Sequence, residues 1–200
     1  KQPIQRRSQE TVDAILAAAE RLIAERSIDR ISTNAIAKAS NVSIGSLYNF
    51  FPNKEAIYFE LADRWLSSIR ASLAELHPAN RELVNWMQWI DELAGRTDQH
   101  YRDQPGLARN YDILRSIPEL RTLNEEHDAW VLDNLSTALS YFGFREPAEA
   151  VGAQAKVITT LIHSLLVAEL ETPEAMRAGV RQSARFLLHS LMAQRFSVLA

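Results

Sequence analysis

Small and hydrogen-bonding side chains are concentrated in one short stretch of the 200-residue chain. The stretch begins at Ser43 and offers hydroxyl, amide and apolar groups on one face of a short helix. Such groups fit the major groove of DNA, where they bond base edges or contact a thymine methyl. Nearby helix starts add a hydroxyl, free N–H groups and an ammonium that can hold phosphates. The DNA contacts predicted from these residue types are Thr33, Ser43, Ile44, Ser46, Tyr48, Asn49 and Lys54.

Other reactive side chains form no comparable constellation in the sequence. The chain has no Cys, which excludes disulfides, thiolate metal ligands and thiol catalysis. Its five His are scattered without the spacing of a metal site. Ser164 beside His163 lacks the GxSxG context of a hydrolase nucleophile. We therefore predict no enzyme activity, catalytic residue, metal or cofactor.

The elements that must position the candidate contacts read as helices. Apolar residues recur at three- and four-residue spacing almost throughout. Ser32, or the Thr after it, can cap a short helix that ends at Asn41, where Asn tolerates a left-handed turn. Ser43 can cap a second short helix, and Asn53 a long one over 54–76. Two short helices joined by a sharp turn predict a helix-turn-helix.

The helix before this pair is expected to start at a Ser8 cap and to run to about Glu25. Ile36 and Leu47 are expected to pack the two short helices together, with Phe50 and the Phe after it in the core. Further helices are predicted over 81–103, 105–116, 118–142, 147–170 and 173–195.

The stretch Ile15–Asp63 resembles the N-terminal domain of the TetR/AcrR family of bacterial transcription regulators. The matching strings are ILAAA at 15–19, VSIGSLYNFF at 42–51 and NKEA at 53–56. The Ser-Asn of the turn departs from the Ala-Gly common in the family. The resemblance implies that Ser43 opens a recognition helix. It also implies phosphate contacts from Thr33, Ser46, Tyr48 and Lys54. By the same resemblance Asn34 is a candidate base contact, and Gly45 allows a close approach to the DNA.

The resemblance and the helical pattern together imply an all-α fold of about nine helices. We expect a three-helix, helix-turn-helix DNA-binding domain over 1–54. A helical effector-binding and dimerisation domain is expected over 55–200, connected through the helix that starts at 54. The first domain holds eight basic and five acidic residues, whereas the remainder holds 14 basic and 20 acidic residues. The net charge of the whole chain is −3. A basic N-terminal part suits a DNA partner.

Aromatic residues in the middle helices can line an apolar effector pocket, although ordinary core packing is the alternative for each residue. The predicted pocket residues are Trp86, Trp89, His100, Tyr111 and Trp130. The last two helices are rich in apolar residues, which favours either an intramolecular hairpin or a four-helix interface between two copies. The predicted dimer contacts are Ile158, Leu161, Leu165, Leu187, Leu188 and Leu191.

The sequence thus favours a ligand-responsive transcriptional regulator, expected to be a repressor. Its expected partners are a palindromic double-stranded operator, a largely apolar or aromatic small-molecule effector and a second copy of itself. The alternatives are a helical small-molecule-binding enzyme and an architectural DNA-binding protein without an effector. No stretch reaches the roughly 18 apolar residues of a membrane span, and no signal peptide is visible. We expect a cytoplasmic, nucleoid-associated protein with no membrane partner.

Overall fold

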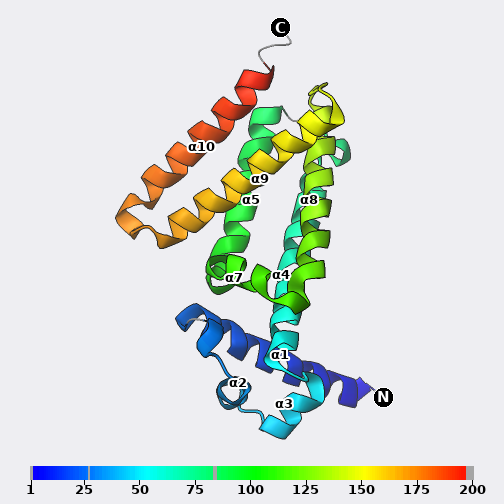
Figure 1. Cartoon of the computed structure of the whole chain (residues 1–200), viewed down its shortest axis with the longest axis vertical. Helices are drawn as coiled ribbons and strands as arrows, with labels where there is room; N and C mark the ends of the chain where they lie inside the picture. Colours follow the sequence, from blue (N-terminus) through cyan, green and yellow to red (C-terminus); the bar gives the residue numbers. More distant parts are fainter. Residues whose placement is uncertain (1, 27, 83–84, 197–200) are drawn as a thin grey trace. The chain divides into compact units, whose positions relative to one another are not determined.

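The computed structural model describes residues 2–26, 28–82 and 85–196, and the regular elements in these ranges are all helical (Figure 1). The predicted all-α class is therefore confirmed. The α-helices are α1 (Gln2–Glu25), α2 (Thr33–Ser40), α3 (Ile44–Phe50), α4 (Lys54–Leu76), α5 (Trp86–Asp103), α6 (Pro105–Arg109), α7 (Tyr111–Ser116), α8 (Arg121–Tyr141), α9 (Ala148–Glu171) and α10 (Glu174–Phe196). Single 3-10 turns lie at Ile28–Arg30, Pro78–Asn80 and Pro118–Leu120.

The chain forms two compact units. Unit 1 comprises the chain up to Leu66 together with Gln104–Asn124, and unit 2 comprises Ser67–Asp103 and the chain from Glu125 onward. Helices α4 and α8 each contribute residues to both units. Unit 1 thus takes in more of the chain than the DNA-binding domain predicted over 1–54, and that functional boundary stays a prediction.

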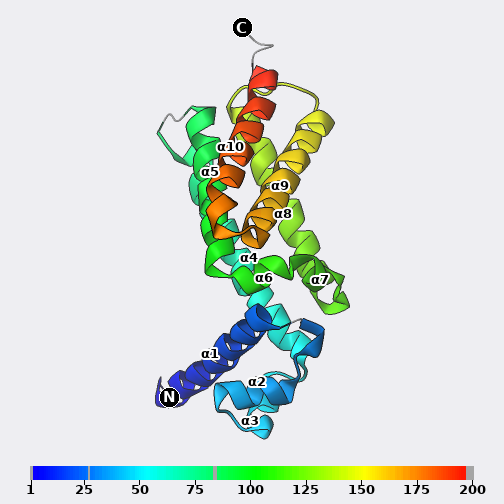
Figure 2. The same cartoon turned by 90° about the vertical axis from the view of Figure 1, so that its left-hand side faces the viewer.

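In unit 1, α2 and α3 lie side by side next to α1 (Figure 2). Helix α1 buries one face, with Ile15, Ala18 and Ala19 fully inaccessible to solvent, as its three- and four-residue spacing predicts. The predicted Ser8 cap is wrong, because α1 already begins at Gln2 and Ser8 lies inside the helix.

Tyr58 anchors α4 in unit 1. Its side chain is 2 % exposed, and its hydroxyl donates a hydrogen bond to the carbonyl oxygen of Ile28 at 3.2 Å. Burial, reinforced by the charges of Glu55 and Asp29, raises the pKa of Tyr58 to about 12. The phenol therefore stays protonated at neutral pH and remains a hydrogen-bond donor to the turn that follows α1.

Helix α6 packs against α1 at a position where only glycine fits. A Cβ on Gly106 would lie 2.9 Å from the backbone nitrogen of Ala24 and 3.0 Å from its Cα. Backbone atoms cannot move aside as the end of a flexible side chain can. Sequence periodicity gave no sign of this contact, because it joins residues far apart in the chain. The predicted 105–116 helix is interrupted at Asn110, which separates α6 from α7.

In unit 2, α9 and α10 form a hairpin and both pack against α5 (Figures 1 and 2). Trp89 of α5 is 1 % exposed, and its indole N–H donates to the carbonyl oxygen of Leu76 at 3.1 Å. This bond satisfies one of the free carbonyls at the end of α4. Helix α5 begins at Trp86 rather than at the predicted residue 81.

Helix α9 is the one helix in the described ranges whose length and hydropathy would suffice for a membrane span. Its Val151, Ala155 and Ile158 are buried, and Glu169 near its end is ion-paired with Arg181. These features fit a helix packed inside a protein unit, and a core helix meets the same length and composition criteria.

Replacing Gly106 tests the close contact between α6 and α1. Gly106→Val should lower the free energy of unfolding by about 1–3 kcal/mol, because overpacking forces backbone shifts. Urea unfolding followed by circular dichroism measures this change. Gly152→Ala is the matched control, since a Cβ there meets nothing within 4 Å, and it should not destabilise the protein. Equal stability of both variants would show that α6 is free to move away from α1.

Candidate nucleic-acid interface

The turn between α2 and α3 depends on Asn41. This residue adopts the left-handed conformation, with φ 55° and ψ 34°. It is the one non-glycine residue with positive φ in the described ranges. Its backbone N–H bonds to the carbonyls of Ala37 and Lys38, and Val42 N–H donates to Ala37 at 3.1 Å. The prediction of a left-handed turn at this Asn is confirmed, and the turn satisfies the last carbonyls of α2.

Three polar side chains fix where the helices of this region begin. Ser32 Oγ accepts from the Ala35 N–H at 3.2 Å at the start of α2. Ser43 Oγ accepts from the Ser46 N–H at 3.1 Å at the start of α3. At the start of α4, Asn53 Oδ1 accepts from a backbone N–H at 2.8 Å. All three are the caps that the sequence predicts, each worth about 1 kcal/mol.

The two faces of α3 differ in chemistry. Leu47 is fully buried together with Ile36 of α2, which joins the two short helices. Tyr48 and Ile44 are 49 % and 38 % exposed on the outer face. The remaining predicted contacts of the stretch are also at the surface, with Ser43, Gly45 and Asn49 exposed and Ser46 half-buried. The predicted groove residues are therefore exposed or half-buried around the part of α3 that Leu47 does not occupy, a surface that we call the α3 face.

Two hydroxyls meet beside the α3 face. Thr33 Oγ1 and the Tyr48 hydroxyl lie 3.0 Å apart and share a hydrogen bond. Thr33 is the first residue of α2, where backbone N–H groups are free to bind an anion. The pair therefore offers two polar oxygens at one edge of the α3 face. Asn34 beside it is exposed, and Lys54 at the start of α4 is half-buried.

Phe50 and Arg21 are placed differently from what the sequence indicates. Phe50 is 37 % exposed, so the expectation that it lies in the core is wrong, whereas Phe51 is buried as expected. Phe50 follows Leu47 by three residues and is the last residue of α3, so helix spacing alone placed it on the buried side. Arg21 of α1 donates from Nη2 to the carbonyl oxygen of Ala39 at 3.3 Å. Sequence reasoning missed this cation near the turn, since the contact spans 18 residues.

Part of this region matches a family of known proteins. Residues 15–61 match the family model described as bacterial regulatory proteins, tetR family. Within this segment the chain is similar to the TetR family. The matched residues include α2, the turn at Asn41 and α3. The family resemblance seen in the sequence is thereby confirmed.

Individual relatives match part of the chain in sequence, whereas solved structures superpose on most of the chain. The regulator EthR of Mycobacterium tuberculosis is 36 % identical over 81 residues, which are 39 % of this chain and 38 % of EthR. An uncharacterized HTH-type regulator of the same species is 36 % identical over 115 residues, 55 % of this chain and 53 % of that protein. The chain therefore spans about half or less of the curated relatives it matches.

Among solved structures, FadR of Bacillus subtilis in complex with stearoyl-CoA superposes with a TM-score of 0.68 at 20 % identity. The match covers 86 % of this chain and 96 % of FadR. At this identity the likeness concerns the fold, and it extends the TetR-type arrangement beyond the helix-turn-helix.

The predicted effector residues are divided between the two units, with Tyr111 in unit 1 and the others in unit 2. Tyr111 belongs to unit 1, where its ring meets Trp65 edge-on with centroids 5.7 Å apart. Trp89 is buried in unit 2, and Trp86 stacks near His189. His100 Nδ1 lies 3.3 Å from Ser68 Oγ, and burial lowers the pKa of His100. Trp130 is half-buried on α8. The pocket formed by these residues stays a prediction.

The predicted dimer contacts fall on both sides of the α9–α10 hairpin. Ile158 and Leu188 are 0 % and 4 % exposed inside unit 2, and Leu165 lines a cavity described below. Leu187 is 47 % exposed, and Leu161 and Leu191 are half-buried. Outside the predicted contact set, the most exposed apolar side chains on the hairpin are Val157, Met176 and Phe186.

Substitution of Asn41 tests the backbone requirement of the turn. Asn41→Ala should lower the free energy of unfolding by about 1 kcal/mol, because a left-handed conformation disfavours Cβ-bearing residues other than Asn and Asp. Asn41→Gly is the matched variant and should leave stability unchanged within a few tenths of a kcal/mol, since Gly adopts this conformation without strain. Thermal and urea unfolding measure both. If Ala and Gly behaved alike, the turn would not depend on the left-handed residue.

Proposed function

We propose that this protein is a homodimeric transcriptional repressor that binds a palindromic operator and releases it when a small-molecule effector binds. The proposal extends to the cytoplasm, at the nucleoid, as its place of action. The observation that carries the DNA-binding part is the exposed α3 face within a segment that matches a family of regulatory proteins.

The α3 face suits DNA because its groups are small and its helix is short. A recognition helix enters the major groove with its N-terminal residues toward the base edges. At that end of α3 stand Ser43, Ile44 and Gly45, and none of them blocks a close approach. The hydroxyl pair of Thr33 and Tyr48, with Lys54, can bind phosphates on either side. Because α3 carries no Arg or Lys, sequence reading rests on few bidentate contacts.

A second copy is supported by the outer side of the α9–α10 hairpin. Phe186 is 70 % exposed and Met176 63 % exposed on α10, and Leu187 lies next to Phe186. Exposed apolar side chains gathered on one helix pair mark a surface that another protein covers. A two-fold dimer buries the same surface on both subunits and places two recognition helices on the two halves of a palindrome.

The effector response is supported by the fold. FadR was solved in complex with stearoyl-CoA, so a protein of this fold can hold a small molecule. Helix α4 contributes to both units and is a continuous element along which a change can pass. An effector acts only if it binds one of two conformations better than the other. An architectural protein without an effector would need no ligand cavity, whereas unit 2 has one beside α5.

Operator binding tests the DNA-binding part of the proposal. The operator is first selected from random duplex DNA with the purified protein. Tyr48→Ala should then weaken binding at fixed salt about tenfold or more, since hydrogen bonds to charged groups contribute about 1.5–3 kcal/mol. Lys54→Ala should weaken binding to all sequences similarly and reduce the slope of affinity against salt by about one for each Lys lost. Gel shift and fluorescence anisotropy measure both effects.

The control for this experiment is Tyr141→Ala. Tyr141 is 48 % exposed, much like Tyr48, but it ends α8 far along the chain from the α3 face. It should leave operator affinity unchanged. Unchanged affinity in Tyr48→Ala, or failure of the wild-type protein to select any sequence, would contradict the proposal.

The oligomeric state tests the dimer. Phe186→Asp combined with Leu187→Asp should give monomers in sedimentation velocity, because two carboxylates would lie in an apolar interface. Met87→Asp is the control, since Met87 is 46 % exposed on α5, outside the hairpin, and it should leave the dimer intact. A dimer that persisted in the double variant would place the interface elsewhere.

A further inference from the structure

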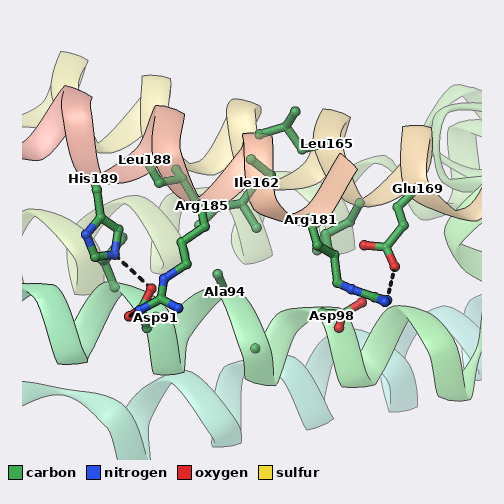
Figure 3. A pocket seen from close by; sticks show the side chains of 14 residues that line it. Asp91, Ala94, Asp98, Ile162, Leu165, Glu169, Arg181, Arg185, Leu188 and His189 are labelled. Carbon is green, nitrogen blue, oxygen red and sulfur yellow. Dashed lines mark hydrogen bonds and ion pairs between the residues drawn. The ribbon is translucent and has the colours of Figure 1, made fainter. Parts of the chain in front are cut away.

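Unit 2 contains a slot between α5, α9 and α10 that the proposed function does not assign (Figure 3). Its volume is about 250 Å³. Helix α5 forms one wall with Ala94 and Gly95, and Ile162 and Leu165 of α9 lie behind them. We call this space the α5–α10 slot. It lies on the inner side of α10, whereas Phe186 and Leu187 point to the outer side.

The α5–α10 slot is open because α5 carries small residues there. A Cβ built on Gly95 meets nothing within 4 Å. The adjacent side chain is only the methyl of Ala94. An apolar protein cavity of about 150 Å³ holds benzene. The slot, at about 250 Å³, therefore has room for an aromatic ring with a small substituent.

Charged groups stand at both ends of the apolar stretch. At one end Asp91 pairs with Arg185 at 2.5 Å and with His189 at 2.8 Å. At the other end Glu169 pairs with Arg181 at 2.5 Å, and Asp98, which is ion-paired with Arg102 on the same helix, borders the same space (Figure 3). Asp91 and Asp98 are seven residues apart, so roughly 10 Å of helix separates the two ends.

The carboxylates and the guanidiniums of the slot differ in burial. The side chains of Glu169 and Asp98 are 7 % and 13 % exposed, whereas those of Arg181 and Arg185 are 47 % and 68 % exposed. A displaced arginine can extend into water, and exposed ion pairs contribute only about 0–1 kcal/mol. A displaced carboxylate would remain buried without a partner, which is strongly unfavourable. An incoming cation can therefore replace an arginine, but an incoming anion cannot readily replace a carboxylate.

We infer that the α5–α10 slot binds an organic cation with a small apolar body. The charge takes the place of the Arg181 guanidinium beside Glu169 and Asp98, and the body lies over Ala94 and Gly95. Asp91 and Asp98 already have cationic partners in Arg185 and Arg102, so the buried carboxylate that the occupant's charge meets is Glu169, opposite the more exposed Arg181. Binding of the cation does not depend on the proposed function, whereas the role of the slot as the effector site rests on it.

The binding experiment uses the full chain without DNA. Phenyltrimethylammonium is titrated by calorimetry against tert-butylbenzene, which has the same shape without the charge, and against benzenesulfonate, an aromatic anion. The cation should bind about tenfold more tightly than its neutral isostere, and the sulfonate should bind less tightly than either. Equal affinity of cation and isostere, or preference for the sulfonate, would overturn the inference.

Filling the slot is the steric test. Gly95→Leu should weaken cation binding about tenfold or more, because the new side chain occupies the open space. The variant should fold, since Leu is a better helix former than Gly and its Cβ meets no clash. Gly152→Leu is the matched control inside α9 and should bind the cation as the wild type does. Retained affinity in Gly95→Leu would overturn the inference.

Charge variants provide a test that does not depend on filling the slot. Glu169→Gln should remove the preference for the cation over tert-butylbenzene while leaving the affinity for the isostere unchanged. Arg185→Gln leaves Asp91 bonded to His189 and should bind the cation at least as tightly as the wild type. Weaker cation binding in Arg185→Gln would assign the recognition to the arginine and overturn the inference.

The inference and the proposed function can fail separately. A chain that binds the cation but selects no operator would refute the proposed function and support the slot. A chain that binds operator but shows no preference for the cation would refute the slot alone. Where both bind, loss of operator affinity on addition of the cation in the wild type, and not in Gly95→Leu, would establish the slot as the effector site.

Discussion

Burial of Leu47 holds the α3 face in place. Helix α3 has seven residues, which is too short to be stable alone in water. Its conformation depends on Leu47 packing with Ile36 beneath it, on the Ser43 cap and on the left-handed turn at Asn41. Each of these features leaves the outer side of α3 free. The burial that stabilises α3 therefore falls mainly on Leu47, and the polar side chains proposed to contact DNA are exposed or half-buried.

The two sides of helix α10 also differ in the chemistry of their side chains. Its inner side, with Arg181 and Arg185, borders the α5–α10 slot, and its outer side exposes Phe186 and Leu187. The inner side carries arginines that form ion pairs beside the slot, whereas the outer side carries exposed apolar side chains. A helix with this division can bind a ligand and a second subunit without either occupying the other's surface. The physical basis is the helical period, which places residues 185 and 187 on different sides.

Local features were predictable from the sequence, because they depend on neighbouring residues. The bounds of α4 (Lys54–Leu76), the caps at Ser32 and Ser43 and the turn at Asn41 all follow from residue type and spacing. Phe50 was misplaced because aromatic character alone does not say which face of a short helix is covered. The cap expected at Ser8 failed because α1 continues toward the N-terminus beyond it.

Contacts between distant segments were not predictable. Packing of Gly106 on Ala24 and the ion pair of Arg185 with Asp91 join residues that no periodicity relates. The same holds for the slot, whose hollow depends on Gly95 meeting no neighbour from another helix. Apolar spacing in the last two helices identified which residues are hydrophobic. It did not say that Ile158 and Leu188 face inward while Leu187 faces solvent.

The hydrogen bond between Thr33 and Tyr48 has an energetic consequence for complex formation. In the free protein the two hydroxyls already satisfy each other at 3.0 Å. One hydroxyl donates in this pair, and the other keeps its own hydrogen and can donate it to a phosphate oxygen while the bond between them persists. Both oxygens are held at a fixed separation before the encounter, and little rotational freedom is lost when the backbone arrives. Under the proposed function, this fixed separation lets the pair orient a bound duplex as well as hold it.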